Sequence, residues 1–296
     1  MVLLSTNPVK ELEYYDHARN KQMPKLMEEH GIALLREQGL QTEERQLRSI
    51  VKGCDYNPLA LILYARLMRY RRNDSCREVD FMKILDGSNQ TEGEALQRVI
   101  SGYREIWPEH SDAHMLLSLA SLFKNEFTLE SLERLVEQCD GAEQLRRLPQ
   151  SKQMEWMAEF VSFGVLSKME AQPVQYRFLP TMRDYYAKQF RQKHKASYLE
   201  CNARLAEDIL RDVKDEYVTQ VIHMEPLYHA MHYLTRAQEY DRALDVFWER
   251  ICRERQFFSQ KVLGAFSNDL DAVSLFFCDD RDWEPIPDSL HPPRIC

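Results

Sequence analysis

Glycine is scarce in this sequence, and the short motifs that mark the commonest phosphate sites are missing. Only 9 of the 296 residues are glycine, and the pattern G-x-x-x-x-G-K-[ST] occurs nowhere. That pattern cradles nucleotide phosphates with backbone amides and a lysine. No strand-like segment ends in the paired acidic residues that hold Mg²⁺ beside such phosphates. Because nucleotide hydrolysis of this kind has no catalyst without these groups, we predict that the chain is not an enzyme.

Paired cysteines and long apolar runs are missing as well. The seven cysteines are Cys54, Cys76, Cys139, Cys201, Cys252, Cys278 and Cys296. None stands in a C-x-x-C spacing, and an odd, unclustered set predicts reduced thiols in a cytosolic protein, without a disulfide framework or a zinc site. No apolar run reaches the roughly 20 residues of a membrane span. The start, MVLLSTNPVKELEYYDH, lacks the features of a signal peptide. We therefore expect a cytoplasmic protein with no membrane partner.

The charge balance is acidic. The chain has 39 Lys and Arg against 47 Asp and Glu, a formal net charge of −8. Such a balance argues against a chain that binds nucleic acid over its whole surface, and it favours protein partners. A hydrophobic share of 44% and a charged share of 29% are typical of a globular protein. The length suffices for two or more domains of about 100–200 residues.

The first part of the chain contains three predicted helices. Apolar residues recur at helical spacing from Gln22 to Gly39, where a glycine is a typical C-cap. A second helix follows Thr42. The third runs from Pro58 to about Arg71 and begins with a proline at the position where its missing N–H costs nothing. A short apolar run, residues 2–6, precedes them and predicts a buried strand.

The middle of the chain has the order of elements of a winged helix. After a polar linker at 85–93, helical segments are predicted at 94–107, 111–123, 128–139 and 151–163. Alternating segments at 165–169 and 174–178 then predict a small hairpin. A further helix begins near Pro180. The last three of these helices followed by a hairpin have the winged-helix order.

From Lys193 onward the sequence predicts only helices. Ile222–Ile251 has the pattern of a helix, a turn at Gln238–Tyr240 and a second helix, with small and aromatic residues where a TPR-like hairpin has them. One such repeat cannot bury its own face, so more repeats are expected where the chain stops. The predicted fold class is mainly α, with a helical domain and a winged helix followed by a TPR-like α-helical hairpin.

Several segments together resemble the middle of a signal-transduction NTPase of the STAND class, the bacterial relatives of the NB-ARC proteins. EEHGIALLREQGL and LRSIVKGCDYNPLALILYARLM are similar to the first helical domain, whose hallmark is a glycine followed shortly by Pro-Leu-Ala-Leu. AHMLLSLASLFKNEFTLESLERLV, GVLSK and YRFLPTMRDYYAKQF are similar to its winged helix. EPLYHAMHYLTRAQEYDRALDVFWERI resembles the helical linker that leads into tetratricopeptide repeats. The resemblance covers most of Lys21 to Phe258.

This resemblance implies a division of the chain and a role. The segments are a remnant of the nucleotide-domain strand and linker (1–20), the first helical domain (21–90), the winged helix (91–192), the helical linker and TPR-like hairpin (193–277) and an irregular tail (278–296). The implied role is a non-catalytic regulatory and scaffolding module that makes nucleotide-state-dependent contacts with its own nucleotide-binding domain or neighbouring protomers. ATP or ADP is expected only with a complete nucleotide-binding domain, so no cofactor is expected here.

The resemblance also implies nucleotide-contact candidates. The family's Pro-Leu-Ala-Leu proline packs near adenine, which points to Pro58 and Leu59; the alternative is that Pro58 only starts its helix. The family's last nucleotide-site strand ends in a phosphate-sensing arginine, and Asn7, which lacks that charge and forked geometry, stands at this place. Leu179 stands where family members often carry a histidine that reaches the β-phosphate, and its side chain donates no hydrogen bond.

A winged helix also raises an alternative function, that of a DNA-binding transcriptional regulator. The local basic residues are Arg177, Arg183, Lys188, Arg191, Lys193 and Lys195. The first four of them are candidate phosphate contacts. The candidate recognition helix, however, contains Glu155 and Glu159, and the overall charge is acidic. A solvated face or an intramolecular contact is the other interpretation of these basic residues.

Histidines are concentrated in one helical segment. His229 and His232 lie three residues apart, with His223 and Glu225 just before them. Metal sites need further ligands and a fixed second shell, and packing of a helical hairpin accounts for the same segment. We therefore predict no metal site.

Overall fold

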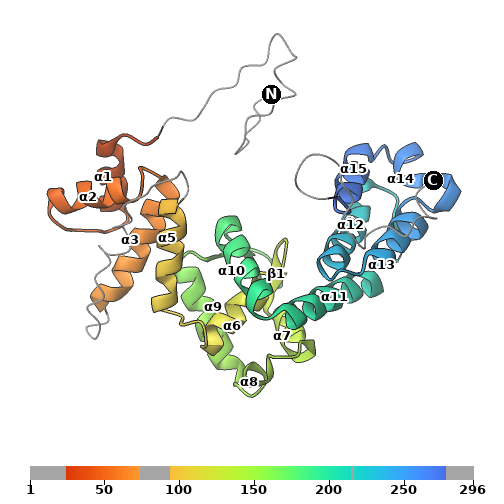
Figure 1. Cartoon of the computed structure of the whole chain (residues 1–296), viewed down its shortest axis with the longest axis horizontal. Coiled ribbons are helices and arrows are strands. Elements are labelled where there is room, and N and C mark those ends of the chain that lie inside the picture. Colours follow the sequence, from red (N-terminus) through yellow and green to blue (C-terminus); the bar gives the residue numbers. More distant parts are fainter. Residues whose placement is uncertain (1–24, 74–93, 215–216, 278–296) are drawn as a thin grey trace, which may run out of the picture. The chain divides into compact units, whose positions relative to one another are not determined.

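The computed structural model describes residues 25–73, 94–214 and 217–277. These residues are mainly helical with three short strands, which confirms the mainly α fold class (Figure 1). The chain divides into two compact units, with the boundary between Tyr103 and Arg104. The predicted strand at 2–6, the linker at 85–93 and the irregular tail at 278–296 lie outside the described residues. No helix within the described ranges combines the length and apolarity needed to cross a membrane.

The first unit confirms the three predicted helices and adds a fourth. Its helices are α1 (Glu28–Glu37), α2 (Glu44–Gly53), α3 (Pro58–Asn73) and α5 (Glu94–Gly102), and a 3₁₀ turn, η2 (Tyr103–Glu105), follows. Helix α5 was expected to open the winged-helix segment 91–192, but it packs on α3. The Tyr103 hydroxyl donates to the carbonyl of Leu63 at 3.0 Å, and Arg98 donates to the carbonyl of Gly53 at 3.4 Å. These contacts place the division of the chain after α5, later than the predicted boundary.

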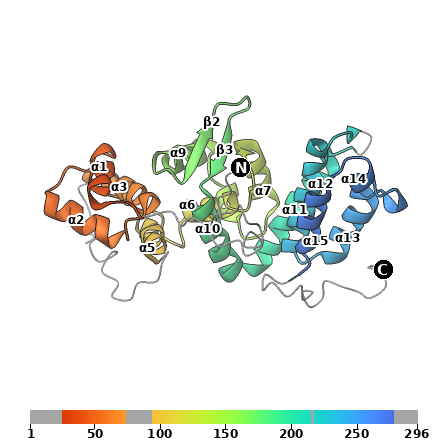
Figure 2. The same cartoon turned by 90° about the horizontal axis from the view of Figure 1, so that it is seen from above.

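The second unit begins with the predicted helices and hairpin. Its first elements are α6 (Asp112–Ala120), β1 (Phe127–Thr128), α7 (Leu129–Gln138), α8 (Glu143–Arg146), α9 (Gln150–Ser162), β2 (Leu166–Met169), β3 (Gln175–Phe178) and α10 (Pro180–Lys193). The strands form an antiparallel sheet in the order β1-β3-β2, and Leu166 is paired with Phe178. Figure 2 shows β2 and β3 side by side. The short β1 and α8 were not predicted.

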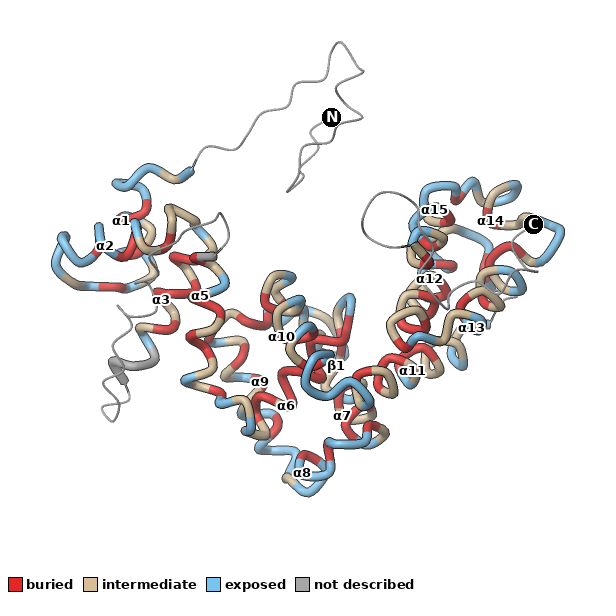
Figure 3. The backbone as a smooth tube through the Cα atoms, in the orientation of Figure 1, coloured by how far each residue is buried: buried red, intermediate tan, exposed pale blue. Residues whose placement is uncertain are grey.

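Local side-chain chemistry explains where these helices start. The Ser111 hydroxyl accepts a hydrogen bond from the His114 N–H at the start of α6, at 3.2 Å. Thr128 and Ser131 form a reciprocal capping box at the start of α7, which satisfies donors that have no partner inside the helix. Pro180 occupies the first turn of α10, where its missing N–H costs nothing. Helix α6 is buried along almost its whole length (Figure 3) and forms the centre of this core.

The rest of the second unit is helical, as predicted. It consists of α11 (Lys195–Asp212), α12 (Val221–Arg236), α13 (Tyr240–Asp245), a π-helical turn η4 (Val246–Ile251), a 3₁₀ turn η5 (Glu254–Gln256), α14 (Phe258–Lys261) and α15 (Phe266–Ser274). The predicted turn lies between α12 and α13, where Gln238 has a left-handed φ of 63°. Helices α11 and α12 pack along each other.

A buried carboxylate ties the last helices to α12. The hydroxyls of Tyr228 and Ser259 donate to the two oxygens of Asp269 at 2.5 and 2.7 Å. Asp269 is only 3% exposed, so these hydrogen bonds replace the water it loses on folding. Burial, followed by the hydrogen bond and charge of Asp269, raises the pKa of Tyr228 above its usual value. The three residues come from α12, α14 and α15, and they join these helices.

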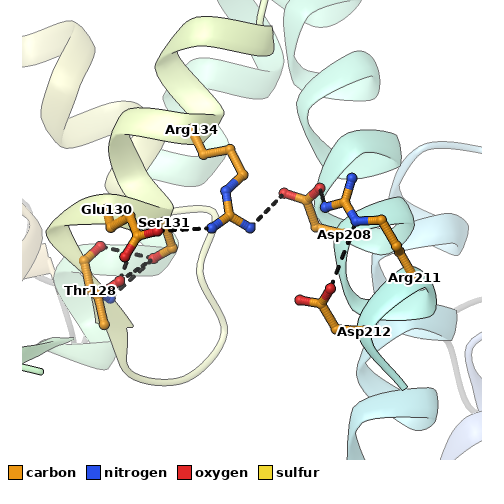
Figure 4. A network of polar contacts seen from close by, with 7 residues as sticks. All are labelled: Thr128, Glu130, Ser131, Arg134, Asp208, Arg211 and Asp212. Atoms are coloured by element: carbon orange, nitrogen blue, oxygen red, sulfur yellow. Dashed lines mark hydrogen bonds and ion pairs between the residues drawn. The ribbon is translucent and has the colours of Figure 1, made fainter. Parts of the chain in front are cut away.

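A disulfide and an ion pair join the end of α7 and α7 itself to α11. Cys139, just after α7, is bonded to Cys201 of α11, with 5.5 Å between their Cα atoms. The prediction of reduced thiols is therefore wrong for these two cysteines, because packing brings together residues separated by 62 positions. Figure 4 shows Arg134 of α7 extending between Glu130 and Asp208. Cys54 and Cys252 are free thiols, and both are buried.

We predict that reduction of this disulfide destabilises the protein. For a sequence separation of 62, the chain-entropy model gives a loss of about 4 kcal/mol in the free energy of unfolding. Urea unfolding with and without dithiothreitol measures it. The double variant Cys139→Ser/Cys201→Ser is the control and should not respond to the reductant. An equal response of the variant and the wild type, or the absence of a linked peptide in a non-reducing digest, would contradict the prediction.

We also predict that Gly31→Ala is destabilising. Alanine in place of a helical glycine usually stabilises by about 1 kcal/mol. A Cβ at position 31, however, would lie 2.8 and 2.9 Å from the two γ-carbons of Val51, so overpacking should lower the free energy of unfolding by about 1–3 kcal/mol. The compensating variant Gly31→Ala/Val51→Ala removes the methyl groups in the way and should recover part of the loss. Thermal unfolding of Gly31→Ala at or above the wild-type temperature would refute this account of the α1–α2 contact.

Candidate functional site

The start of α3 is built by a turn and a side-chain cap. Asp55 and Tyr56 both have left-handed backbone conformations, with φ of 51° and 56°. The Asn57 side chain then accepts a hydrogen bond from the Ala60 N–H at 3.0 Å. An asparagine cap and a proline in the first turn are each favoured at a helix start. The local sequence therefore accounts for the position of Pro58 without any ligand.

The same junction presents the two nucleotide-contact candidates to the surface. Pro58 is exposed and Leu59 is half-buried, whereas Ala60 and Leu61 behind them are fully buried. Cys54 lies beneath the turn, and burial raises the pKa of its thiol to about 12, which keeps it protonated and unreactive at neutral pH. Asn7 lies outside the described residues, so the contact predicted for it remains a prediction.

The structure gives several of the basic residues partners within the chain. Arg177 on β3 donates to Glu126 through Nε at 2.8 Å, and this hydrogen bond lowers the pKa of Glu126. The guanidinium of Arg191 lies 6.0 Å from the ring centre of Tyr198. Lys193 is paired with Glu109. Lys188 is exposed on α10. An intramolecular role therefore accounts for Arg177 and Lys193.

The candidate recognition helix α9 carries two carboxylates, Glu155 and Glu159. Glu155 is paired with Lys152 at 2.7 Å. Glu159 is half-buried, and burial raises the pKa of its carboxyl. It lines a cleft of about 420 Å³ together with Trp156 and Asp112. Carboxylates in this position repel a phosphate backbone.

Arg183, the remaining candidate, has different neighbours from those that the sequence suggested. Its Nη1 donates to the carbonyl of Lys124 at 2.8 Å, and its Nε and Nη2 contact Asp184. The N–H of Lys124 donates in turn to the hydroxyl of Tyr233 at 2.9 Å. Arg183 therefore belongs to a group of side chains from the segment after α6, from α10 and from α12. We call Lys124, Arg183, Arg236, His229 and His232 the cation cluster.

Repulsion between positive charges perturbs the cation cluster. The pKa of Lys124 is lowered by burial, by Arg236 and by Arg183, and only Asp271 opposes this. Burial and the charges of Arg236, Lys124, His229 and Arg183 lower the pKa of His232 to about 3. Burial and Lys124 also lower the pKa of His229, against the attraction of Glu225. Both imidazoles are therefore neutral at pH 7.

His223 and His229 have polar partners other than a metal ion. His223 is exposed and contacts Thr219, and the ring of His229 lies 3.3 Å from the Asn125 amide. Across the described residues, no group of three or more His, Cys, Asp or Glu side chains is placed to hold a metal ion.

Leu179 stands immediately before α10. Its N–H donates to the carbonyl of Val165 at 2.9 Å, and the side chain is half-buried. This hydrogen bond fixes the backbone between β3 and α10.

Sequence reasoning found Arg183 of the cation cluster but missed Lys124 and Arg236, because residues so far apart in the chain carry no shared local pattern.

Comparison with models of known protein families finds no match to this chain. Comparison with curated proteins finds no match either. The functional interpretation therefore rests on the residues and their arrangement.

Proposed function

We propose that the chain is a non-catalytic regulatory and scaffolding module of a STAND-like signal-transduction protein, acting in the cytoplasm through contacts with other proteins or domains. The proposal combines the sequence resemblance with one observation of the surface. An apolar face is exposed at the last described helices. It consists of Val262, Phe266 and Leu270, whose exposed fractions are 64%, 64% and 58%.

This face has the spacing of a helix contact surface. Phe266 and Leu270 are four residues apart on α15, so their side chains lie on the same side of the helix. Ile222, at the start of α12, is also 58% exposed. In stacked helical hairpins, each pair covers the exposed face of the pair before it. An exposed pair of this kind supports a role in which another helix, from a following repeat or a partner protein, packs on α15.

The start of α3 supports the same proposal in a second way. Pro58 and Leu59 are apolar side chains at the surface of the first unit. In a STAND-like protein this position would face the adenine held by a separate nucleotide-binding domain. The basic residues tested above give the DNA-binding alternative less support, because Arg177 and Lys193 are already paired with carboxylates.

We predict that the isolated chain neither binds nucleotide tightly nor hydrolyses it. Titration of the full chain with ATP or ADP and Mg²⁺ in a calorimeter should give no binding in the micromolar range, and an assay for released phosphate should give no turnover. The reason is the missing phosphate-binding loop. Micromolar affinity accompanied by turnover would refute the proposal. Pro58→Ala is the companion variant, and it should not change either result.

We further predict that the apolar face is covered by protein in the cell. A photo-reactive phenylalanine analogue placed at position 266 and irradiated in the native host should cross-link to a protein that carries a phosphate-binding loop. The same analogue at Ser267, an exposed neighbour on α15, is the matched control and should cross-link much less. Equal cross-linking at both positions, or a single partner without any nucleotide-binding domain, would contradict the regulatory role.

A further inference from the structure

The backbone of Lys124 is held between α10 and α12 by hydrogen bonds on both sides of the residue. Lys124 is fixed by its own backbone, since its N–H donates to Tyr233 of α12 and its carbonyl accepts from Arg183 of α10. Tyr233 is only 5% exposed, so this contact anchors the segment to the core. The fold therefore fixes the backbone of Lys124 between Arg183 and Tyr233. Arg236 follows Tyr233 by three residues on α12, so it lies on the same side of that helix.

Few negative charges balance this cluster. Asp184 pairs with Arg183 at 2.9 Å, and Asp271 and Glu225 act only at longer range, on Lys124 and His229 respectively. Over the residues that the structure describes, no carboxylate lies within ion-pair distance of Lys124 or Arg236. The cluster thus carries two cations without a paired anion in a chain whose net charge is −8.

The cluster also contains an imidazole with an unused nitrogen. The Nε2 atom of His232 is buried and has no hydrogen-bond partner. Leaving a buried polar atom without a partner costs free energy. The charges that act on His232 come from Arg236, Lys124, His229 and Arg183, and all of them disfavour its protonated form. Crowded cations and an unsatisfied nitrogen together indicate a place where an anion would be stabilised.

We propose that Lys124, Arg183 and Arg236 form a binding site for a phosphate group. A doubly charged phosphate offsets the mutual repulsion of these cations more completely than a single carboxylate does. Its oxygens also match the Arg236 guanidinium and the Lys124 ammonium group, and they would compete with Asp184 for Arg183. The site is separate from the Pro58 junction and does not depend on the proposed function.

The first experiment measures binding of inorganic phosphate to the full chain by calorimetry at pH 7 and low ionic strength. The variants Lys124→Gln and Arg236→Gln should each weaken binding by about tenfold, because each removes a charged donor. Lys188→Gln removes the same charge from an exposed position on α10 outside the cluster, and it should bind like the wild type. A response that sodium chloride reproduces at equal ionic strength, or an equal loss in Lys188→Gln, would overturn the proposal.

A second measurement keeps the proposal testable even if these variants fail to fold. The pKa of His232 in the wild-type chain is followed by NMR, with and without sulfate, which stays doubly charged over the acidic range. Without the anion the pKa is about 3, and a bound dianion should raise it. An unchanged pKa at a sulfate concentration that saturates a binding signal would place the anion elsewhere and overturn the assignment.

Three carriers of the phosphate group are then compared in the same assay. They are inorganic phosphate, a phosphoserine peptide and a short single-stranded oligonucleotide. Binding that depends on Lys124 and Arg236 supports the site for whichever carrier binds tightest, and the ranking identifies the carrier. Binding of all three that is insensitive to both variants would overturn it. Since Pro58→Ala leaves this site intact, failure here is distinguishable from failure of the proposed function.

Discussion

Packing of α11 between α7 and α12 is the constraint on which the second unit depends. On one side, the Cys139–Cys201 bond and the hydrogen bond from the Asp140 N–H to Glu200 join α11 to the end of α7. At its other end, Arg250 donates to the carbonyls of Leu210 and Val213 at 3.2 and 2.7 Å. These carbonyls have no partner inside the helix. Because both ends of α11 are anchored, the helices on its two sides have a fixed separation.

The position of the cation cluster follows from this constraint. Helix α12 packs along α11, and its residues at 229, 232/233 and 236 share one face because they are spaced by three or four positions. With α11 fixed to α7, that face meets the segment after α6, where Tyr233 contacts Lys124. A hydrogen bond of the Lys124 backbone therefore places residue 124 against α12.

Local patterns predicted most of the elements but few of the contacts between them. The start of α3 was predictable because Pro58 acts on its own backbone, and the hairpin was predictable because β2 and β3 alternate and are adjacent in the chain. The strand β1 is too short, at Phe127–Thr128, to give a periodic signal. The disulfide and the neighbours of Arg183 depend on residues 53–62 positions apart, and no local pattern contains that information.

The candidate site residues likewise include some that the sequence could predict and some that it could not. Pro58 and Leu59 came from a motif, and the structure places both at the surface of the first unit. The basic residues were chosen because they lie close together in the sequence. Closeness in the sequence does not show which carboxylates they pair with in the fold. Arg177 was predicted as a phosphate contact, yet its guanidinium is paired with Glu126. Arg183 lies near Lys124 and Arg236, and these two residues are not part of the basic stretch of the sequence.

The net charge of the chain and the local charge at the cation cluster therefore give different expectations for the binding of an anion. The chain carries −8 overall, but at physiological salt a charge is screened beyond about 8 Å. A single phosphate at Lys124 and Arg236 would respond mainly to those cations. A DNA backbone is longer than this distance and would also meet carboxylates such as Glu155 and Glu159 of α9. The same physical argument thus favours a compact phosphate ligand at the cation cluster and disfavours an extended polyanion over α9 and α10.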